Sequence, residues 1–375
     1  MNVCVIGGGA VGAFCAWRIA QSGATVDLVE PRALAVADPQ AASWAAAGML
    51  GAVSEALGAQ DPDRRLALGR VALDSWRRAQ NDLGGALLSA FGSMLAADTP
   101  VRSAQIEDLA TKARAAGFRA DWVRSKALAD LGFALAPTSA HALHLPDERR
   151  VDIPATLAAL GAVIAGAGVR THTDVAMAVG QADGRLRVSL ASGASLTCDR
   201  VVAAPGIGTS ATTAFDGLAA SVPALAHLRP AKGQMALLAA TAPFVVRGGD
   251  IYLVPRSDGL AIGATMEAGL ADRTVDPAAI ERLRDAAIRL APSLASAPIV
   301  RAWAGVRPMS PDHDPIIGPS GPPGCLVAAG HSRNGWLLAP LTADMIVAQI
   351  FDRSPPLPAS FFDPERFREG APHEP

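Results

Sequence analysis

Short apolar runs and helical stretches alternate at the beginning of the chain. Residues 3–6 are apolar and rich in valine and isoleucine, which is typical of a buried parallel strand. After a run of glycines, one face of a predicted helix carries Val11, Phe14, Cys15 and Ile19. We expect that helix to end at Ser22-Gly23, and residues 25–29 predict a second buried strand. The pattern therefore predicts a strand–helix–strand unit.

The middle of the chain changes to a strand pattern. A helix is predicted for residues 153–166, followed by strands at 169–171 and 175–179. Asp183-Gly184 is a hairpin turn signal, and after it Leu186, Val188 and Leu190 alternate as a half-buried strand should. Residues 195–198 and 200–204 predict two more strands. A three-stranded antiparallel meander that returns to a parallel sheet differs from a plain nicotinamide-binding domain, where helices make the crossovers.

A second group of strands follows, separated by glycine turns. The predicted strands are residues 233–238, 244–247, 251–255, 260–264 and 299–306. Asp276 is expected to cap a helix that Pro277 opens. Near the end of the chain residues 325–329 predict a strand, and Ala339 or Pro340 is expected to begin the last helix. The fold class is thus α/β (α+β overall), with a second domain based on a mostly antiparallel sheet.

Composition narrows the function classes. The chain has 375 residues, half of them apolar, 18% charged, and a net charge of −2 without any basic run. A compact enzyme of two domains fits these totals, whereas nucleic acid and an anionic membrane are unexpected partners. Cys4, Cys15, Cys198 and Cys325 lack the spacing of a metal site or disulfide framework, and we expect them to be buried. The first apolar run lacks the features of a signal peptide and no long apolar span follows, so a cytoplasmic location is expected.

The opening glycines carry the first recognisable chemistry. Gly7, Gly9 and Gly12 give the G-x-G-x-x-G spacing between a strand and a helix, and Glu30 ends the second strand. Gly7 permits the tight turn, Gly9 lets the backbone approach a pyrophosphate, and Gly12 lets the helix pack closely on the strand. Glu30 is placed to accept hydrogen bonds from a ribose. These residues together predict a dinucleotide site, and the alternative is an ordinary glycine turn.

Five segments in the same order resemble a known family. They are Ala42-Ser-Trp-Ala-Ala-Ala-Gly-Met-Leu50, Tyr252-Leu-Val-Pro-Arg256, Ile262-Gly-Ala-Thr-Met266, Trp303-Ala-Gly-Val-Arg-Pro308 and Gly330-His-Ser-Arg-Asn-Gly335. Together they resemble the glycine oxidases of thiamin biosynthesis, in the D-amino-acid oxidase family of FAD-dependent oxidoreductases. The resemblance implies a discontinuous FAD-binding domain of residues 1–85, 147–220 and 309–375. Residues 86–146 and 221–308 would form the substrate domain.

The resemblance also implies which residues hold the cofactor. FAD would be bound by residues of the glycine loop, the small-residue segment, the meander and the last glycine motif. These are Gly7, Gly9, Val11, Gly12, Glu30, Ala46, Ala47, Gly48, Met49, Val175, Gly206, Gly330, His331, Arg333, Asn334 and Gly335. The N-terminal end of the last helix could then stabilise negative charge on the reduced flavin.

At the substrate end, the resemblance assigns the carboxylate of the substrate to Arg307. Tyr252 would lie beside that carboxylate, with Met266 and Arg333 near the substrate. An arginine suits this role because its guanidinium can bind a carboxylate through two hydrogen bonds. The alternative without a role in substrate binding is that Arg307 pairs with an acidic residue at the surface, Tyr252 is a core aromatic residue and Met266 only fills space. Neither a metal site nor an acid/base residue is assigned.

The implied reaction is oxidative deamination of glycine and other small amines or D-amino acids. Hydride would pass from the α-carbon to the flavin N5, the imine would be hydrolysed, and O2 would reoxidise the flavin to give H2O2. Alternatives are a dehydrogenase with a quinone or partner-subunit acceptor, a nicotinamide dehydrogenase, or a flavin-binding subunit without turnover. Asp250 and Ser332 differ from the family pattern, which leaves the preferred substrate open. A homo-oligomer is also left open.

Overall fold

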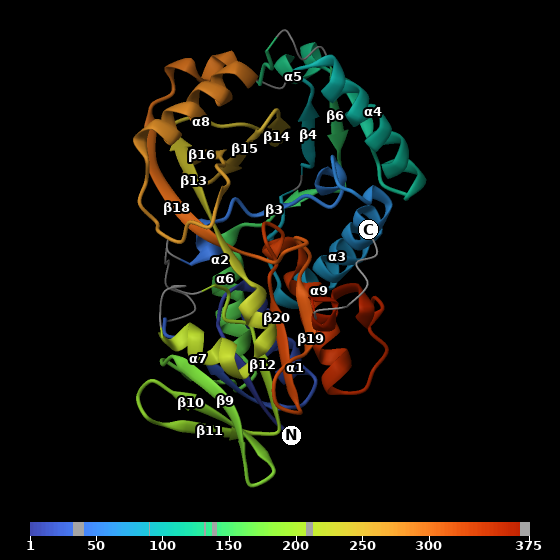
Figure 1. Cartoon of the computed structure of the whole chain (residues 1–375). Helices are drawn as coiled ribbons and strands as arrows, with labels where there is room; N and C mark the ends of the chain where they lie inside the picture. Colours follow the sequence, from blue (N-terminus) through green and yellow to red (C-terminus); the bar gives the residue numbers. More distant parts are fainter. Residues whose placement is uncertain (33–40, 90, 131–132, 137–140, 208–212, 368–375) are drawn as a thin grey trace.

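A computed structural model of the chain describes residues 1–32, 41–89, 91–130, 133–136, 141–207 and 213–367. Figure 1 shows two lobes, one around the N-terminal strands and one that carries the largest sheet. Between the labelled sheets, β3 (Met49–Leu50) pairs antiparallel with β7 (Arg149–Arg150). The boundaries of two separate domains stay a prediction.

The lobe at the bottom of Figure 1 is built on a six-stranded sheet with the order β19-β20-β12-β1-β2-β8. All neighbouring strands are parallel except β19 and β20. The strands are β1 (Asn2–Ile6), β2 (Thr25–Val29), β8 (Arg170–His172), β12 (Arg200–Ala203), β19 (Ile316–Pro319) and β20 (Cys325–Ala329). Strands from the beginning, the middle and the end of the sequence therefore lie side by side.

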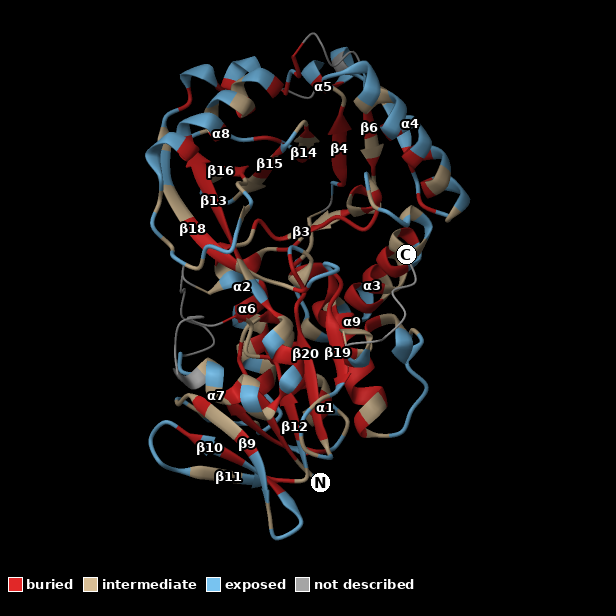
Figure 2. Ribbon diagram, viewed as in Figure 1, coloured by how far each residue is buried: buried red, intermediate tan, exposed pale blue. Residues whose placement is uncertain are grey.

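This sheet is buried on both faces, as its continuous apolar runs require. In β1, Val3 and Val5 belong to one core cluster, whereas Cys4 and Ile6 belong to another on the opposite face. Side chains that alternate along a strand point to opposite faces, so an apolar residue is needed at every position. Figure 2 shows β12 and β20 of this sheet coloured mostly as buried.

Helices cover one face of the sheet and the meander covers the other. On the first face lie α1 (Ala10–Gln21), α3 (Pro62–Leu83), α6 (Ile153–Gly166) and α9 (Gly335–Ile350). On the second face lie α7 (Thr213–Ser221) and the three antiparallel strands β9 (Ala176–Ala182), β10 (Arg185–Leu190) and β11 (Ser195–Cys198). The predicted meander is confirmed, and its turn has positive φ at Asp183 (52°) and Gly184 (73°).

The other lobe contains a nine-stranded sheet. Its order is β17-β13-β16-β15-β14-β4-β6-β5, and β18 pairs with the free side of β13. The strands are β4 (Ser93–Ala96), β5 (Asp121–Arg124), β6 (His141–Leu145), β13 (Arg229–Leu238), β14 (Val245–Gly248), β15 (Ile251–Arg256), β16 (Gly259–Gly263), β17 (Glu267–Ala268) and β18 (Ile299–Met309). Only β4 and β14 are parallel, so the predicted mostly antiparallel sheet is confirmed.

Two helices on this lobe begin directly after a capping residue, and the predicted cap of one of them is confirmed. In α8 (Pro277–Leu290), the Asp276 carboxylate accepts from the amide of Ala278 at 2.9 Å, and Pro277 is the first helical residue. In α4 (Pro100–Ala115), Thr99 caps in the same way. The remaining short elements are α2 (Ala42–Ala45), α5 (Ser125–Asp130), η1 (Ser54–Ala56), η2 (Pro223–His227), η3 (Pro292–Ser296), η4 (Ala359–Phe362) and η5 (Pro364–Phe367).

The predicted start of the last helix is wrong. Helix α9 begins at Gly335, and Pro340 lies inside it. Proline has no N–H for the carbonyl of Trp336, four residues earlier, and normally breaks a helix interior. Here the indole N–H of Trp76 donates to that carbonyl at 2.8 Å and to the carbonyl of Leu337 at 3.1 Å. A donor from α3 therefore replaces the missing helical one, and the helix continues.

Several features could not be predicted from the pattern. Strands β5, β6 and β19 were not expected, and β18 continues three residues beyond Val306. All four cysteines are buried, as expected, and Cys4, Cys198 and Cys325 share one core cluster. Within the described part of the chain, every helix is too short or too polar to span a membrane. The cytoplasmic location stays a prediction.

Candidate functional site

A cavity of about 650 Å³ extends from the carboxyl ends of the central strands to the large sheet. Most of the predicted site residues line it. They are Gly7, Gly9, Val11, Glu30, Ala46, Ala47, Gly48, Met49, Gly206, Tyr252, Met266, Arg307, Gly330, His331, Arg333, Asn334 and Gly335. Small-molecule and cofactor sites usually have volumes between about 300 and 1,000 Å³. Segments far apart in the sequence thus meet around one space.

Two predicted residues lie outside the described lining of this cavity. Gly12 faces the turn, where a β-carbon would overlap the carbonyl oxygen of Gly7, so its role is the close packing that the motif predicted. Val175 immediately precedes β9, and its carbonyl accepts from the amide of Ala191 at 2.9 Å. The predicted contact of Val175 with an adenine stays a prediction.

The glycine loop is shaped by close backbone approach. Gly7 has a φ of 98°, and a β-carbon there would overlap the carbonyl oxygen of Ala204 at the end of β12. Gly9 caps α1 with extended backbone and without a capping side chain. The N-terminus of α1 therefore lies at the cavity with its positive dipole end, a favourable place for phosphate groups.

Glu30 and Ser43 hold this loop from either side. One carboxylate oxygen of Glu30 accepts from the amide of Gly8 at 2.6 Å, and the other pairs with Arg32 at 3.0 Å. Ser43 Oγ accepts from the amide of Ala10 at 2.9 Å. Sequence reasoning predicted Glu30 and missed Ser43, which lies inside the recognised small-residue segment and was not singled out.

The last glycine motif leads directly into α9. Asn334 is the residue before the helix, and the motif residues on either side of it line the cavity. His331 is fully enclosed, and its Nε2 lies 2.8 Å from Thr342 Oγ1. Burial lowers the pKa of His331 from 6.5 to about 3, so the imidazole stays neutral at physiological pH. Ser332 has a positive φ of 52°, and its amide donates to the carbonyl of Pro308 at 2.9 Å.

At the opposite end of the cavity, Arg307 lies across the sheet. It projects from β18 over Gly233 on β13, where a β-carbon would overlap its guanidinium. Tyr252 on β15 lies beside this guanidinium, and its hydroxyl is 3.5 Å from Met235 Sδ. Burial raises the pKa of the Tyr252 phenol although Arg307 and Arg247 oppose the shift, so the phenol keeps its proton. A β-carbon at Gly263 on β16 would likewise lie 2.9 Å from the Tyr252 hydroxyl, so Gly233 leaves room for the guanidinium and Gly263 for the phenol.

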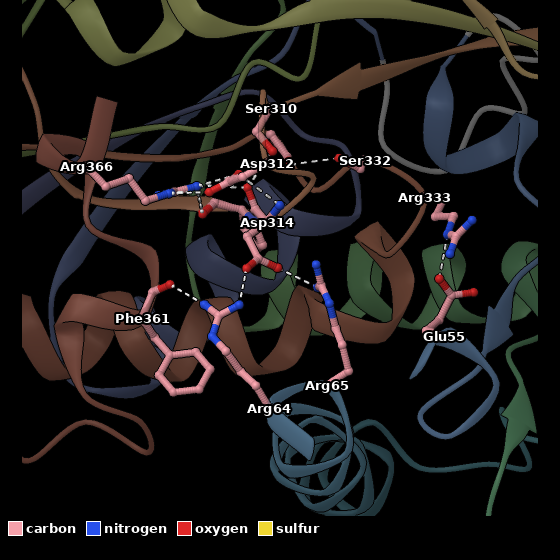
Figure 3. Close-up of polar contacts among 12 residues, drawn as sticks. Glu55, Arg64, Arg65, Ser310, Asp312, Asp314, Ser332, Arg333, Phe361 and Arg366 are labelled. Carbon is pink, nitrogen blue, oxygen red and sulfur yellow. Dashed lines mark hydrogen bonds and ion pairs between the residues drawn. The ribbon is translucent and has the colours of Figure 1, made fainter. Parts of the chain in front are cut away.

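A second charged group lines the cavity between these two ends. The Glu55 carboxylate pairs with Arg333 at 2.5 Å and with Arg247 at 3.0 Å (Figure 3 shows the pair with Arg333). Burial alone would raise the pKa of Glu55, but the two guanidiniums outweigh it and hold that pKa below its usual range. Arg333 is therefore held by a carboxylate, whereas the described ion pairs include none for Arg307.

A buried carboxylate supports the loop behind this site. Asp314 pairs with Arg64 and Arg65 from α3, and Arg366 pairs with Asp312 at 2.7 Å (Figure 3). The carbonyl of Asp314 accepts from Ser310 Oγ at 2.5 Å. This loop follows β18, and Met309 at the end of that strand bridges to His331. The contacts connect β18, the last glycine motif and the segment around Arg366.

The residues present fit FAD. The glycine loop leaves no room for a β-carbon at Gly7 or Gly12, and the N-termini of α1 and α9 both lie at the cavity. One helix end suits a pyrophosphate and the other suits a ring system that gains negative charge on reduction. The small residues Ala46, Ala47 and Gly48 line the wall between them.

Comparison with known proteins gives the same picture. The sequence profile of the family described as DAO, FAD dependent oxidoreductase, matches residues 2–349. Glycine oxidase of Geobacillus kaustophilus is 31% identical over 365 residues, which cover 94% of this chain and 93% of that protein. The crystal structure of glycine oxidase from Geobacillus kaustophilus has a TM-score of 0.84 at 26% identity, covering 98% of both chains. A bifunctional ThiO/ThiG protein of Synechocystis sp. is 33% identical over 232 residues, covering 59% of this chain and 34% of that protein.

Proposed function

Because the chain belongs to the DAO family of FAD dependent oxidoreductases, we propose that it oxidises glycine and other small amines with FAD bound along this cavity. One observation carries the proposal. A single cavity joins the glycine loop, the N-terminus of α9 and an arginine–tyrosine pair suited to a carboxylate. A dinucleotide flavin and an amino acid can therefore meet in one site.

When bound, FAD supplies the two-electron oxidation of the carbon–nitrogen bond. The chain itself binds and orients the reactants. The loop from Gly7 to Gly12 and the carboxylate of Glu30 would hold the adenine half, with Gly206 beside them. The segment Ala46–Met49 and the motif Gly330–Gly335 would hold the flavin half. Orientation in a site that excludes water accounts for most of what a protein adds to cofactor chemistry.

Arg307 would bind the substrate carboxylate through a charge-assisted pair of hydrogen bonds. Tyr252 keeps its proton and can donate to the same carboxylate. Met266 is half exposed at the mouth, with its sulfur 3.8 Å from an Arg307 nitrogen. Arg333 is engaged by Glu55, so its role is to complete the wall of the cavity beside the substrate. No residue needs to act as an acid or base if the amine binds in its neutral form.

The products would be an imine or glyoxylate, ammonia and hydrogen peroxide. The likeness to glycine oxidase and to the ThiO/ThiG protein supports glycine as substrate and a place in thiamin biosynthesis. A strain that lacks this gene is expected to need added thiazole or thiamin, whereas growth without either would remove that assignment.

The absorption spectrum of the purified protein tests the cofactor. A flavin spectrum is expected, and a colourless preparation that FAD cannot reconstitute would overturn the proposal. Hydrogen peroxide release with glycine, sarcosine and D-alanine under air then tests the reaction. Reduction of the flavin by these amines without peroxide would identify a dehydrogenase that uses another acceptor.

A further inference from the structure

Arg307 has a hydrogen-bond partner that comes from the loop after β16. Its Nη1 donates to the carbonyl oxygen of Thr265 at 3.2 Å, and Met266 Sδ lies 3.8 Å from the same nitrogen. Because Gly233 has no β-carbon, the guanidinium can lie directly against its backbone. The direction in which Arg307 points therefore depends on where the Thr265 carbonyl is held.

The side chain of Thr265 is fixed on both sides. Its hydroxyl donates to Glu267 Oε1 at 2.6 Å and accepts from the amide of Gln234 at 2.9 Å. Gln234 Nε2 donates to the same Glu267 oxygen at 2.8 Å, and the Gln234 side chain is fully buried. The amide of Thr265 also donates to the carbonyl of Gln234 at 3.3 Å. These residues form a polar bracket, defined as Gln234, Thr265 and Glu267.

The polar bracket is anchored to the scaffold of the large sheet. Gln234 lies in the middle of β13, and its Oε1 accepts from the amide of Asp276, the cap of α8, at 2.6 Å. Two residues before Gln234, Lys232 Nζ pairs with Asp272 at 2.7 Å. Both contacts tie the loop between β17 and α8 to the strand that carries Gly233. The loop is therefore held at several points along its length.

We propose that Thr265, held by Gln234 and Glu267, is a positioning residue that sets the orientation of Arg307 before the substrate arrives. The inference rests on the proposed function, in which Arg307 binds the substrate carboxylate. A free arginine side chain has many rotamers, and binding must select one of them. Because the Thr265 carbonyl already accepts from one N–H of Arg307, the remaining N–H donors of the guanidinium are directed into the cavity. Binding of a carboxylate therefore costs less side-chain entropy.

The test removes the hydroxyl and measures carboxylate affinity in the FAD-loaded enzyme. Thr265→Val is compared with Thr265→Ser, which keeps the hydroxyl, and with Thr197→Val, a change at an exposed residue of β11, as the matched control. The probe is acetate, titrated by the change in the visible flavin spectrum. We expect the Kd for acetate and the KM for glycine to rise about three- to tenfold in Thr265→Val, the effect of losing one hydrogen bond.

The other readouts should hardly move. We expect kcat within about twofold of the wild type, unchanged FAD content and a melting temperature lowered by no more than about 4 °C in Thr265→Val, with Thr265→Ser and Thr197→Val close to the wild type. Thr265→Ala removes the hydroxyl without a methyl in its place, and it repeats the measurement if Thr265→Val loses FAD. An acetate affinity at the wild-type value in both hydroxyl-free variants would overturn the inference.

A double variant shows whether Thr265 acts through Arg307. In an Arg307→Ala background, Thr265→Val should have no further effect on acetate affinity, because the side chain that it orients is gone. Equal losses in both backgrounds would overturn the inference and leave the proposed function intact. An Arg307→Ala variant that binds acetate as tightly as the wild type would overturn the site assignment itself.

Discussion

At the scale of single residues, Arg307 carries the largest share of the expected substrate affinity. Arg307→Ala should raise the KM for glycine about ten- to a hundredfold, from the loss of roughly 1.5–3 kcal/mol of charge-assisted bonding. Steady-state peroxide release measures this change. The matched control is Arg301→Ala on the same strand, since Arg301 is an exposed residue paired with Asp258 at 2.6 Å. An unchanged KM in Arg307→Ala would remove this residue from the site.

Gly233 affects the same cation from the neighbouring strand. In Gly233→Ala the new β-carbon would overlap the guanidinium of Arg307, which is the far end of a flexible side chain and can move away. We therefore expect a KM for glycine about three- to thirtyfold higher, with little change in melting temperature. Gly180→Ala serves as control, because a β-carbon there meets no other atom within 4 Å. A KM equal to that of the wild type would contradict this account of the close packing.

His331 predicts a specific pH dependence of stability. Its pKa is lowered from 6.5 to about 3 by burial, so between these values the unfolded chain binds the proton more readily. The free energy of unfolding should then fall as the pH drops through this window. In His331→Gln, the loss between about pH 7.5 and about pH 5 should be smaller by about 1–2 kcal/mol. Denaturant unfolding of the FAD-loaded protein measures it, with exposed His141→Gln as control.

At the scale of elements, the start of α9 depends on one indole. Trp76→Phe keeps the aromatic ring but removes the donor to the carbonyls of Trp336 and Leu337. Pro340 offers no replacement, so we expect the free energy of unfolding to fall by about 1–3 kcal/mol. Trp122→Phe on β5, which is partly exposed, should change it by less than about 0.5 kcal/mol. Equal effects of the two substitutions would show that the indole donor is not what holds this helix end.

Helix α9 also shows where prediction from the local sequence pattern fails. Asp276 and Pro277 predicted the start of α8 correctly, because a cap and a first-turn proline act within one turn. Pro340 predicted the start of α9 wrongly, because the compensating donor comes from Trp76, 264 positions away by difference of residue numbers. The meander was predictable from alternation and from one turn. Strand β19 was not, because it is an edge strand whose one strand partner among the described residues is β20.

The site residues also divide into those that a local sequence pattern predicts and those that only the folded structure reveals. The glycine loop is a local motif, and its residues could be read from spacing alone. Arg307 and Tyr252 were predicted by family resemblance together with the chemistry of carboxylate binding. Glu55 and Arg247 were missed, because they lie in separate segments and only the fold brings the carboxylate to the guanidinium at 3.0 Å. Residues without a motif become visible as a site only in three dimensions.

At the scale of the whole molecule, Asp314 joins three distant parts of the chain. Asp314→Asn removes the charge that pairs with Arg64 and Arg65 and leaves two guanidiniums without it in a mostly buried place. We expect the free energy of unfolding to fall by about 2–4 kcal/mol, measured by denaturant titration. Asp74→Asn, which loosens an exposed pair with Arg77 on α3, should cost less than about 1 kcal/mol. A loss no larger than that of the control would show that this pairing contributes little to stability.

The strand order of the central sheet has a consequence for synthesis of the chain. Strand β12 pairs with β1 on one side and with β20 on the other, so residues 2–6 and 325–329 belong to one sheet. A ribosome releases the first strand long before the last one exists, and the intervening polypeptide includes every strand of the large sheet. Strand pairings this distant in sequence form slowly and leave sheet edges exposed meanwhile. Until residues 325–329 have been synthesised, the nascent protein therefore holds an incomplete cofactor-binding sheet with exposed strand edges, which is the kind of surface that chaperones bind.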